Sequence, residues 1–421
     1  MNQAVFVIVI MIVTILLFVF EVFPLGITAF LTATVLYMFG IIDEKMFFEQ
    51  LVNKNTLLIA GMCILGNAFF VTGMAKKAGN LITNFAKTER SMIVGVMCVA
   101  GIMSAFLSNF GTIACLMPIC IGMATSKGIK PIKLLIPLCA AATVGGCCTL
   151  SGSPGNLTAK TVIEKMSGGV QTVTFWEYGR VGFPMLIAVI LVMALWGTNL
   201  IPDRQGENNV TEKKDFSDVP EWKGYITLVV FILSVIGMSL TGYIKWLPPM
   251  HIIVSFACLI LVLSRAITQK QAFDSIDLQT IFLITFVTPL GTALKTSGAS
   301  AMIADNVKLI FGNSSPIIIT AVIWLVTWCL TQVMSNMATA ALFCPVAWEI
   351  GIAIGVDPRA AVIAALFGSS VAVCTPIAMP GDTMIMGPAG ARFGDFFKSG
   401  ILMSVASFLI SMILLPIFYP F

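Results

Sequence analysis

The stretch MSAFLSNFGTIACLMP (Met103–Pro118) places a Ser-Asn pair in the middle of a long apolar segment, and LTQVMSNMATAALFCP (Leu330–Pro345) repeats this arrangement. Ser335-Asn336 follows Ser108-Asn109 by 227 positions. In both copies a Thr follows the Ser by four residues, and a Pro follows that Thr by six. A polar pair duplicated together with its apolar surroundings indicates an internal repeat.

The composition predicts an integral membrane protein. Of the 421 residues, 58% are hydrophobic and only 10% are charged, with a mean hydropathy of +0.98, whereas soluble domains carry about 25% charged residues. The first apolar run (4–20) has no basic residue before it and no small-residue cleavage site after it, so we expect a retained span rather than a signal peptide. The expected location is a bacterial inner membrane, as a multi-pass protein whose partner is the lipid bilayer.

The sequence does not support a nucleic-acid-binding protein, a disulfide-rich or metal-binding protein, or an enzyme. No basic block or arm is present, which argues against nucleic acid as a partner. The 11 cysteines contain no CxxC and are expected to be small buried hydrophobes, and the single His251 is expected to be structural. The membrane core shows no catalytic set, so an enzyme is not expected. Four acidic residues near predicted helix ends are expected to be solvated: Glu164, Asp305, Glu349 and Asp357.

Two apolar runs, 92–126 and 316–353, are too long for one membrane span, which needs about 20 residues. A Ser-Asn pair lies near the centre of each. We therefore predict two re-entrant hairpins, each made of two half-helices that enter and leave on the same face. Non-helical backbone at that depth is tolerated where protein or a water-filled cavity surrounds it.

Two further runs, about 133–166 and 358–390, are interrupted by Pro-Gly pairs. SGSPGN (Ser151–Asn156) and TPIAMPGDT (Thr375–Thr383) contain Pro-Gly pairs 226 positions apart. Proline removes a backbone donor and glycine loosens the chain, so we predict a broken membrane helix at each. Downstream, FWEYGRVG (Phe175–Gly182) resembles FGDFFKSG (Phe393–Gly400), so the two halves correspond element by element.

The predicted fold is an all-α membrane protein of two inverted-topology repeats, each with a re-entrant hairpin and a broken helix. Repeat 1 comprises residues 1–201, a hydrophilic linker comprises 202–224, and repeat 2 comprises 225–421. An odd number of crossings per repeat inverts the second against the first. Most Lys and Arg residues fall on one side when the ends of the first hairpin are placed inside. This orientation puts the linker in the cytoplasm and both termini outside.

The hairpin tips predict a binding site. Ser and Asn are good N-cap residues, so each pair starts a half-helix whose unpaired N–H groups and positive dipole end attract an anion. The preceding half-helix ends there with free carbonyls and a hydroxyl, Ser104 or Thr331, which suit Na⁺. Because the hairpins enter from opposite faces, we expect one anion site between two cation sites. The alternative for a single Ser-Asn pair is helix packing, which the duplication makes less attractive.

With these motifs in place, the chain resembles the divalent-anion/sodium symporter family, the transporters of di- and tricarboxylates and sulfate. That family carries two Ser-Asn-Thr hairpin motifs and two broken helices reading roughly Thr-Pro-Pro-Asn. The resemblance implies one sodium site at Ser104, Ser108, Asn109 and the backbone of Gly152. It implies a second at Thr331, Asn336 and the backbones of Met334 and Ala378. The implied substrate-binding residues are Ser108, Asn109, Phe110, Ser153, Pro154, Ser335, Asn336, Met337, Met379 and Pro380.

The resemblance also implies a homodimer that works as an elevator. A scaffold would hold the dimer contact, the hairpins and broken helices would move, and segments 76–90 and 295–315 would connect the two. The chain departs from the family pattern where Phe110 and Met337 replace Thr, and Met379 replaces another Thr. Asp382 stands where an Asn is expected. The chain is also expected to be one span shorter at the N-terminus than the family's usual form.

The predicted function is sodium-coupled import of a small organic anion similar to a di- or tricarboxylate, without an organic cofactor. The apolar replacements favour a substrate with an apolar portion or with fewer carboxylates. Sodium is preferred over protons because neither tip carries a carboxylate, and Asp382 is the one acidic candidate nearby. A proton-coupled carrier, an exchange-type carrier and an anion channel remain as alternatives.

Overall fold

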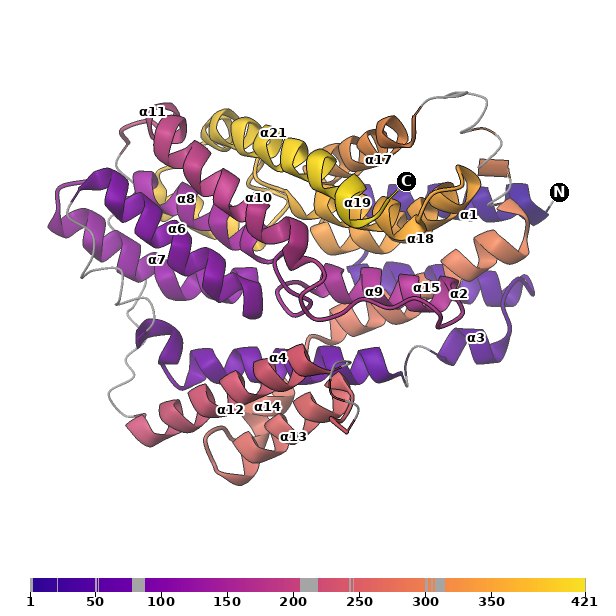
Figure 1. The fold of residues 1–421 in the computed structure, drawn as a ribbon, viewed down its shortest axis with the longest axis horizontal. Helices are drawn as coiled ribbons and strands as arrows, with labels where there is room; N and C mark the ends of the chain where they lie inside the picture. The colour runs from indigo at the N-terminus through magenta and orange to yellow at the C-terminus, as the bar shows by residue number, and fades with distance from the viewer. Residues whose placement is uncertain are drawn as a thin grey trace.

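The computed structural model describes residues 3–20, 22–49, 51, 53–77, 88–204, 219–241, 244, 246–299, 302–303, 306 and 315–420. Over these residues the regular structure is helical (Figure 1). The elements are α1 (Gln3–Val19), α2 (Leu25–Met38), α3 (Glu44–Phe48), α4 (Lys54–Val71), α6 (Glu89–Phe106), α7 (Asn109–Ser126), α8 (Ile132–Gly145), α9 (Pro154–Met166), α10 (Gly179–Val192), a π-helical turn (Met193–Gly197), α11 (Thr198–Leu200), α12 (Glu221–Leu240), α13 (Met250–Leu263), α14 (Gln269–Asp274), α15 (Leu278–Thr296), α17 (Pro316–Thr331), α18 (Asn336–Ala353), α19 (Pro358–Ser370), α20 (Pro380–Ala389) and α21 (Phe393–Phe418).

Both predicted hairpins are present and start their second half-helix at the predicted residue. The first joins α6 to α7 and the second joins α17 to α18. Ser108 caps α7 with φ −62° and ψ 140°, and Ser335 caps α18 with φ −65° and ψ 144°. These extended backbone angles are typical of N-cap residues, and their near identity confirms that the two tips are copies of one structure.

Both predicted broken helices are also present. The first consists of α8 and α9, with residues 146–153 between them, and the second consists of α19 and α20, with residues 371–379 between them. The same packing holds each break. A Cβ on Gly182 of α10 would lie 2.3 Å from the carbonyl oxygen of Cys147, and a Cβ on Gly400 of α21 would lie 2.2 Å from that of Val373. Only glycine lets the last span of each repeat approach the broken segment this closely.

Two of the remaining spans pack against a span of the other repeat. In the first repeat α4 packs along α13 of the second, and in the second repeat α15 packs along α2 of the first. Figure 1 shows α4, α12, α13 and α14 as one group along the lower edge, apart from α6, α7, α8 and α10. Buried side chains of α1, α2, α3 and α15 form a separate hydrophobic cluster that also includes the start of α18.

The surface of the long helices is apolar, as lipid requires. Large hydrophobic side chains are exposed along α12 and α21, among them Leu233 at 61% and Ile413 at 58%. Eight of the described helices are long and apolar enough to cross a membrane, and five shorter apolar helices accompany them. The shorter ones include α8 and α17, which are parts of the broken helix and hairpin. The prediction of a multi-pass membrane protein is confirmed.

Some predicted segments lie wholly or partly outside the described residues. Residues 205–218 of the linker, 78–87 of the first connecting segment and most of 300–314 in the second, including Asp305, are among them. The structure adds features that periodicity did not predict. These are the short helices α3 and α14, and the π-helical turn after α10.

Candidate functional site

The tip of the first hairpin is closed by its own side chains. Ser108 Oγ accepts a hydrogen bond from the backbone N–H of Gly111 at 3.2 Å. Ser104, in the last turn of α6, donates its hydroxyl to Asn109 Oδ1 at 2.7 Å. Three of the residues predicted for the first sodium site therefore lie together. The fourth, Gly152, lies nearby, because a Cβ there would be 2.9 Å from the carbonyl oxygen of Ala105.

The tip of the second hairpin has the same construction. Ser335 Oγ accepts from the N–H of Ala338 at 3.2 Å, and Thr331 donates to Asn336 Oδ1 at 3.0 Å. The same hydroxyl lies 2.6 Å from the carbonyl oxygen of Ser369, near the end of α19, so the two acceptors share its one proton. Asn336 Nδ2 lies 3.5 Å from the carbonyl oxygen of Ser370. The second tip is thus tied to its own broken helix.

In both repeats a threonine from the broken segment binds the end of the first half-helix of the hairpin. Thr149 donates its hydroxyl to the carbonyl of Ala105, and Thr375 donates to that of Gln332 at 2.5 Å. These threonines precede Gly152 and Ala378, the two backbone positions of the predicted sodium sites, by three residues each. Oxygen atoms from hydroxyls, amides and unwound backbone therefore gather at each tip, which is the chemistry that Na⁺ takes in broken-helix carriers.

The second half of each broken helix, α9 or α20, begins against the hairpin of the other repeat, and this links the two repeats. A Cβ on Gly155, in the first turn of α9, would lie 3.6 Å from Cβ of Ala340 in α18. A Cβ on Gly381, in the first turn of α20, would lie 2.5 Å from Cδ1 of Ile113 in α7. Ile113 and Ala340 occupy equivalent positions, 227 residues apart. The two contacts between the repeats are therefore copies of each other.

The predicted substrate-binding residues differ in exposure between the two tips. In the first tip Ser108 is exposed and Phe110 is 49% exposed, while Asn109 is half-buried. In the second tip the three equivalent residues are half-buried. Thr280 of α15 donates its hydroxyl to Asp277, and its oxygen lies 3.3 Å from Met337 Sδ. The first tip is therefore the more exposed of the two.

The two side walls also differ. Ser153 and Pro154 are half-buried, and Ser153 Oγ accepts from the N–H of Gly155 at 3.3 Å as the cap of α9. Met379 is 5% exposed, caps α20 without a side-chain hydrogen bond, and accepts the hydroxyl of Thr143 at its sulfur at 3.1 Å. Pro380 is exposed. The replacement of a capping hydroxyl by Met379 leaves the start of α20 less well satisfied than the start of α9.

The prediction that Glu164 is solvated is wrong. Glu164, near the end of α9, accepts hydrogen bonds from Lys160 and from Asn55 Nδ2, the latter at 3.1 Å, and its side chain is 11% exposed. Lys160 is 6% exposed and donates to Thr172 at 2.7 Å. Asp357 is also engaged, since it caps α19 and binds Arg359 at 2.6 Å. Lys160 and Arg359 are local partners, four and two residues from Glu164 and Asp357, whereas Asn55 comes from α4, 109 positions away.

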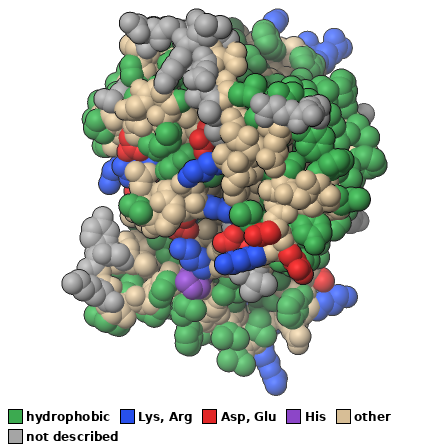
Figure 2. All heavy atoms as spheres, turned by 90° about the vertical axis from the view of Figure 1, so that its right-hand side faces the viewer, with side chains coloured by type: hydrophobic (Ala, Val, Ile, Leu, Met, Phe, Trp, Pro, Cys, Tyr) green, Lys and Arg blue, Asp and Glu red, His purple; other side chains and the backbone are tan. Residues whose placement is uncertain are grey.

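We call the contacts of α9 with the start of α4 and the end of α3 the α4–α9 latch. It consists of the Asn55–Glu164 bond, a bond from Asn55 Nδ2 to Thr161 at 3.1 Å, and ion pairs of Lys54 with Glu164 at 3.3 Å and of Lys165 with Glu49 at 3.4 Å. Figure 2 shows the face towards the right-hand side of Figure 1, where acidic and basic side chains gather in the middle and hydrophobic side chains occupy much of the rest.

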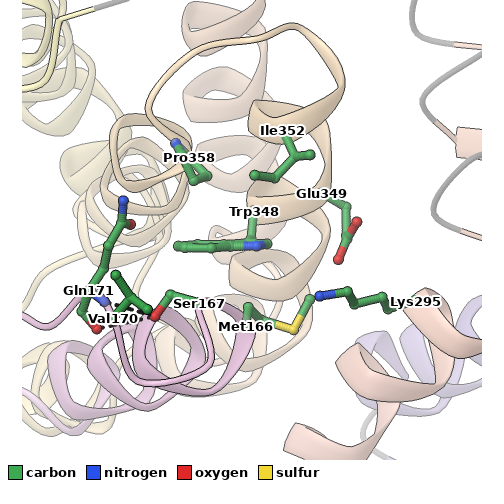
Figure 3. A pocket seen from close by; sticks show the side chains of 9 residues that line it. All are labelled: Met166, Ser167, Val170, Gln171, Lys295, Trp348, Glu349, Ile352 and Pro358. Carbon is green, nitrogen blue, oxygen red and sulfur yellow. Dashed lines mark hydrogen bonds between the residues drawn. The ribbon is translucent and has the colours of Figure 1, made fainter.

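A cavity of about 370 Å³ lies at the end of α9 between α18 and α15. Figure 3 shows Trp348 across its centre, with Lys295 and Glu349 to one side and Gln171 to the other. None of the residues that line it belongs to the predicted substrate or sodium sites. This hollow is therefore separate from the predicted site, which stays a prediction.

Comparisons with known proteins agree with the geometry. Residues 15–368 match the CitMHS family, described as citrate transporter. The chain is 22% identical over 438 residues to the sodium-dependent dicarboxylate transporter SdcS of Staphylococcus saprophyticus, covering 95% of this chain and 83% of that one. It is 27% identical over 197 residues to an uncharacterized transporter of Synechocystis, covering 47% of this chain and 31% of that longer protein.

Among solved structures, the chain is similar to the YdaH transporter of Alcanivorax borkumensis. The TM-score is 0.68 at 14% identity, covering 99% of this chain and 98% of that one, which establishes similarity of fold. The resemblance to sodium-coupled anion transporters is confirmed at the level of the family, and a carrier rather than an enzyme is indicated. Because the family match extends over most of its length, the chain belongs to the CitMHS family of citrate transporters.

Proposed function

We propose that this protein is a secondary active transporter that imports a small organic anion with carboxylate groups, driven by Na⁺. The observation that carries the proposal is the duplicated tip, in which Ser104 and Thr331 donate to Asn109 and Asn336 in the same way. Each amide oxygen marks one cation position, and the starts of α7 and α18 offer N–H groups to an anion between them. The sodium-dependent dicarboxylate transporters among its relatives support this choice.

We further propose that the chain divides into a scaffold and a moving group. The scaffold would comprise α1–α4 and α12–α15, and the moving group would comprise α6–α10 and α17–α21. The packing of α4 on α13 and of α15 on α2, each across the two repeats, supports a rigid scaffold. The contacts of α9 with α18 and of α20 with α7 support a single moving body. A homodimer formed through the scaffold belongs to the same proposal.

The contacts of the tips with the scaffold favour an inward-facing conformation. With the ends of the first hairpin inside, α4 runs inward and α15 runs outward. A Cβ on Gly111 of the first tip would lie 2.5 Å from Phe70, at the inner end of α4. Met337 of the second tip contacts Thr280, at the inner end of α15. Both tips are therefore level with the inner ends of the scaffold helices, and the first tip is the exposed one.

Transport by purified protein in proteoliposomes tests the function. We expect an inward Na⁺ gradient to drive saturable accumulation of labelled citrate, succinate or fumarate, and external unlabelled anion to elicit counterflow. Accumulation that needs no Na⁺ gradient would overturn sodium coupling. Flux that rises linearly with concentration, with no counterflow, would favour an anion channel. Stabilisation of the detergent-solubilised protein by the same anions only when Na⁺ is present would report their joint binding.

A further inference from the structure

The acidic-aromatic motif that follows each broken helix contains one buried carboxylate. The motif is Phe175–Gly182 in the first repeat and Phe393–Gly400 in the second, and the two carboxylates, Glu177 and Asp395, occupy equivalent positions 218 residues apart. A buried carboxylate is costly unless hydrogen-bond donors surround it. In both copies a donor comes from the end of the last span of the other repeat.

Glu177 of the first repeat is bound by the end of the second repeat. Tyr419, the buried residue that follows α21, donates its hydroxyl to Glu177 Oε1 at 3.0 Å. The guanidinium of Arg359, at the start of α19, lies over the Tyr419 ring, 5.4 Å from its centroid. Thr174 donates to Glu177 Oε2 at 3.1 Å. The end of α21 is therefore fixed against the first repeat.

Asp395 of the second repeat is bound by the end of the first. Arg204, four residues after α11, donates to Asp395 Oδ2 at 2.8 Å, and the same oxygen accepts the backbone N–H of Arg392 at 2.8 Å. Lys133, at the start of α8, donates to the carbonyl of Ile201 at 2.7 Å and so holds the segment that carries Arg204. This arrangement is the inverse of the first.

The first motif also holds the unwound part of the broken helix in its own repeat. The carbonyl of Phe175 accepts the backbone N–H of Leu150 at 3.0 Å, and the hydroxyl of Tyr178 donates to the carbonyl of Asn156 at 2.9 Å. Leu150 and Asn156 lie on either side of Gly152, whose backbone belongs to the first predicted sodium site. The position of this backbone therefore depends on the motif.

The second motif holds its unwound segment by close packing. A Cβ on Gly400 would lie 2.2 Å from the carbonyl oxygen of Val373, and Ser404 Oγ, one turn further along α21, lies 3.5 Å from Cys374 Sγ. Val373 and Cys374 precede Ala378, the backbone position of the second predicted sodium site, by five and four residues. Both predicted sodium sites thus have a buried carboxylate behind them rather than among their ligands.

The two carboxylates are engaged elsewhere and are not sodium ligands themselves. Besides the donors named above, Glu177 pairs with the exposed Arg180 at 3.7 Å. Within the described part of the chain, no hydrogen bond or ion pair of either carboxylate reaches a residue of the predicted sodium sites. An unwound backbone lacks the regular bonds of a helix, so its carbonyls need other contacts to fix their direction. Such outer partners tune the affinity of a metal site.

We propose that Tyr419 and Arg204 are positioning residues for the two sodium sites. By binding Glu177 and Asp395, the end of each repeat fixes the backbone that coordinates Na⁺ in the other repeat. The proposal rests on the function proposed above and adds to it the residues that set sodium affinity. Without one of these bonds the unwound segment samples more conformations, and the apparent Kd for Na⁺ rises as the competent fraction falls.

The test follows the melting temperature of the detergent-solubilised protein as Na⁺ replaces K⁺ at constant total concentration. Binding of Na⁺ to the folded protein raises the melting temperature. Tyr419→Phe removes one hydroxyl and should displace this curve to about tenfold higher Na⁺, the lower end of the loss when outer partners of a metal site are removed. Arg204→Ala, which removes a partly exposed side chain, should displace it similarly through the second site.

Two further variants separate positioning from other effects. Glu177→Gln keeps an acceptor for the Tyr419 hydroxyl and should keep the wild-type curve, whereas direct attraction of Na⁺ by the carboxylate would be lost. Tyr225→Phe makes the same change as Tyr419→Phe at an exposed position of α12 and should also match the wild type. A general loss of stability lowers the whole curve without moving it along the Na⁺ axis, so the two effects are distinct.

Each outcome decides the proposal. If Tyr419→Phe or Arg204→Ala lowers the curve without displacing it, the bond concerned contributes to stability alone and the proposal fails for that repeat. A displacement by Glu177→Gln as large as that by Tyr419→Phe would replace positioning by direct electrostatics and overturn the proposal. A wild type that Na⁺ stabilises no more than K⁺ does would instead reject the sodium sites of the proposed function.

Discussion

At the scale of single residues, Asn109 and Asn336 are the side chains on which the proposed sodium sites depend. Each amide oxygen accepts one hydroxyl donor from the preceding half-helix, at 2.7 Å and 3.0 Å. We expect Asn109→Ala and Asn336→Ala each to lower sodium-stimulated uptake at least about tenfold, because losing one charge-assisted contact costs about 1.5–3 kcal/mol. The dependence of initial uptake rate on Na⁺ concentration measures this loss.

A matched control removes the same side chain elsewhere. Asn199 is exposed, in α11, and Asn199→Ala should transport like the wild type. Expression and monodispersity of the three variants should be equal. Normal sodium stimulation in either tip variant would contradict the assignment of that tip.

Phe110 and Met337 are predicted to set the choice of substrate. Both replace a hydroxyl-bearing residue of the family pattern with an apolar one, and Phe110 is 49% exposed beside the N-cap of α7. Phe110→Thr with Met337→Thr should shift selectivity towards compact dicarboxylates, because two donors replace two apolar walls. Competition of a panel of unlabelled carboxylates against labelled substrate measures the shift. An unaltered competition profile would place these side chains away from the ligand.

Sequence reasoning located the tip residues because duplication made them visible. A single Ser-Asn pair has many uses in a membrane helix, but two pairs with matched Thr and Pro spacing have few. It missed Gln332, which donates to Val371 at 3.1 Å and accepts from the N–H of Cys374 at 3.1 Å. Its repeat partner is Ala105, so this bond has no duplicate and no pattern could reveal it.

At the scale of elements, the boundaries of hairpins and broken helices followed from length and from helix chemistry. Runs of more than 30 residues cannot be single spans, and a Ser cap or a Pro-Gly pair fixes where the second half-helix begins. What the sequence could not show is which elements pack together across the repeats. The pairing of α15 with α2, and the contacts of α9 with α4, depend on the tertiary arrangement of side chains far apart in the chain.

The α4–α9 latch is present in one repeat only. The residues equivalent to Lys160, Thr161 and Glu164 are Met386, Gly387 and Gly390, 226 positions later. None of these three can form an ion pair, so the inverse arrangement, with α20 against α15, has no matching latch. The latch should therefore stabilise the inward-facing conformation alone.

We expect Lys54→Ala with Asn55→Ala to shift the population towards the outward-facing conformation. These changes remove the α4 side of the latch and leave Lys160 paired with Glu164 within α9. The lost contacts correspond to about 1.5–3 kcal/mol, or roughly a tenfold to hundredfold shift. Labelling of a cysteine at Phe110 by a membrane-impermeant maleimide supplied from the inside should slow accordingly.

The control for the latch variant breaks a different ion pair. Arg180 and Glu177 pair at 3.7 Å at the start of α10, and the Arg180 side chain is 49% exposed. Both residues belong to the proposed moving group, so Arg180→Ala should leave the labelling rate unaltered. Equal labelling of the latch variant and the wild type would show that the latch does not bias the conformation.

At the scale of the whole molecule, inversion of the repeats would allow one chain to adopt two conformations that open to opposite sides of the membrane. In the proposed mechanism each repeat would adopt the contacts of the other, so the inward-facing and outward-facing arrangements would differ by few contacts and a ligand would shift the population between them. The asymmetry between an exposed first tip and a second tip packed on α15 would then belong to one of the two states. Loss of the latch and movement of the tips along α4 and α15 would produce the other.

A disulfide between scaffold and moving group should stop transport. Asn55 Nδ2 and Thr161 Oγ1 lie 3.1 Å apart across α4 and α9, so Asn55→Cys with Thr161→Cys should form a bond on oxidation or with a short bifunctional reagent. In an elevator these helices separate in every cycle, so uptake should cease after crosslinking and return on reduction. Fumarate binding should persist, because the tips remain assembled in the trapped state.

The matched crosslink joins two helices that are proposed to move together. A Cβ on Gly155 would lie 3.6 Å from Cβ of Ala340, within the range that a disulfide spans. Oxidation of the double variant Gly155→Cys, Ala340→Cys should not alter its uptake rate. Continued transport by the crosslinked α4–α9 pair would exclude a moving group that includes α9. Arrest by the α9–α18 crosslink would mean that the two repeats move against each other, so that rocking of one repeat on the other would replace the elevator.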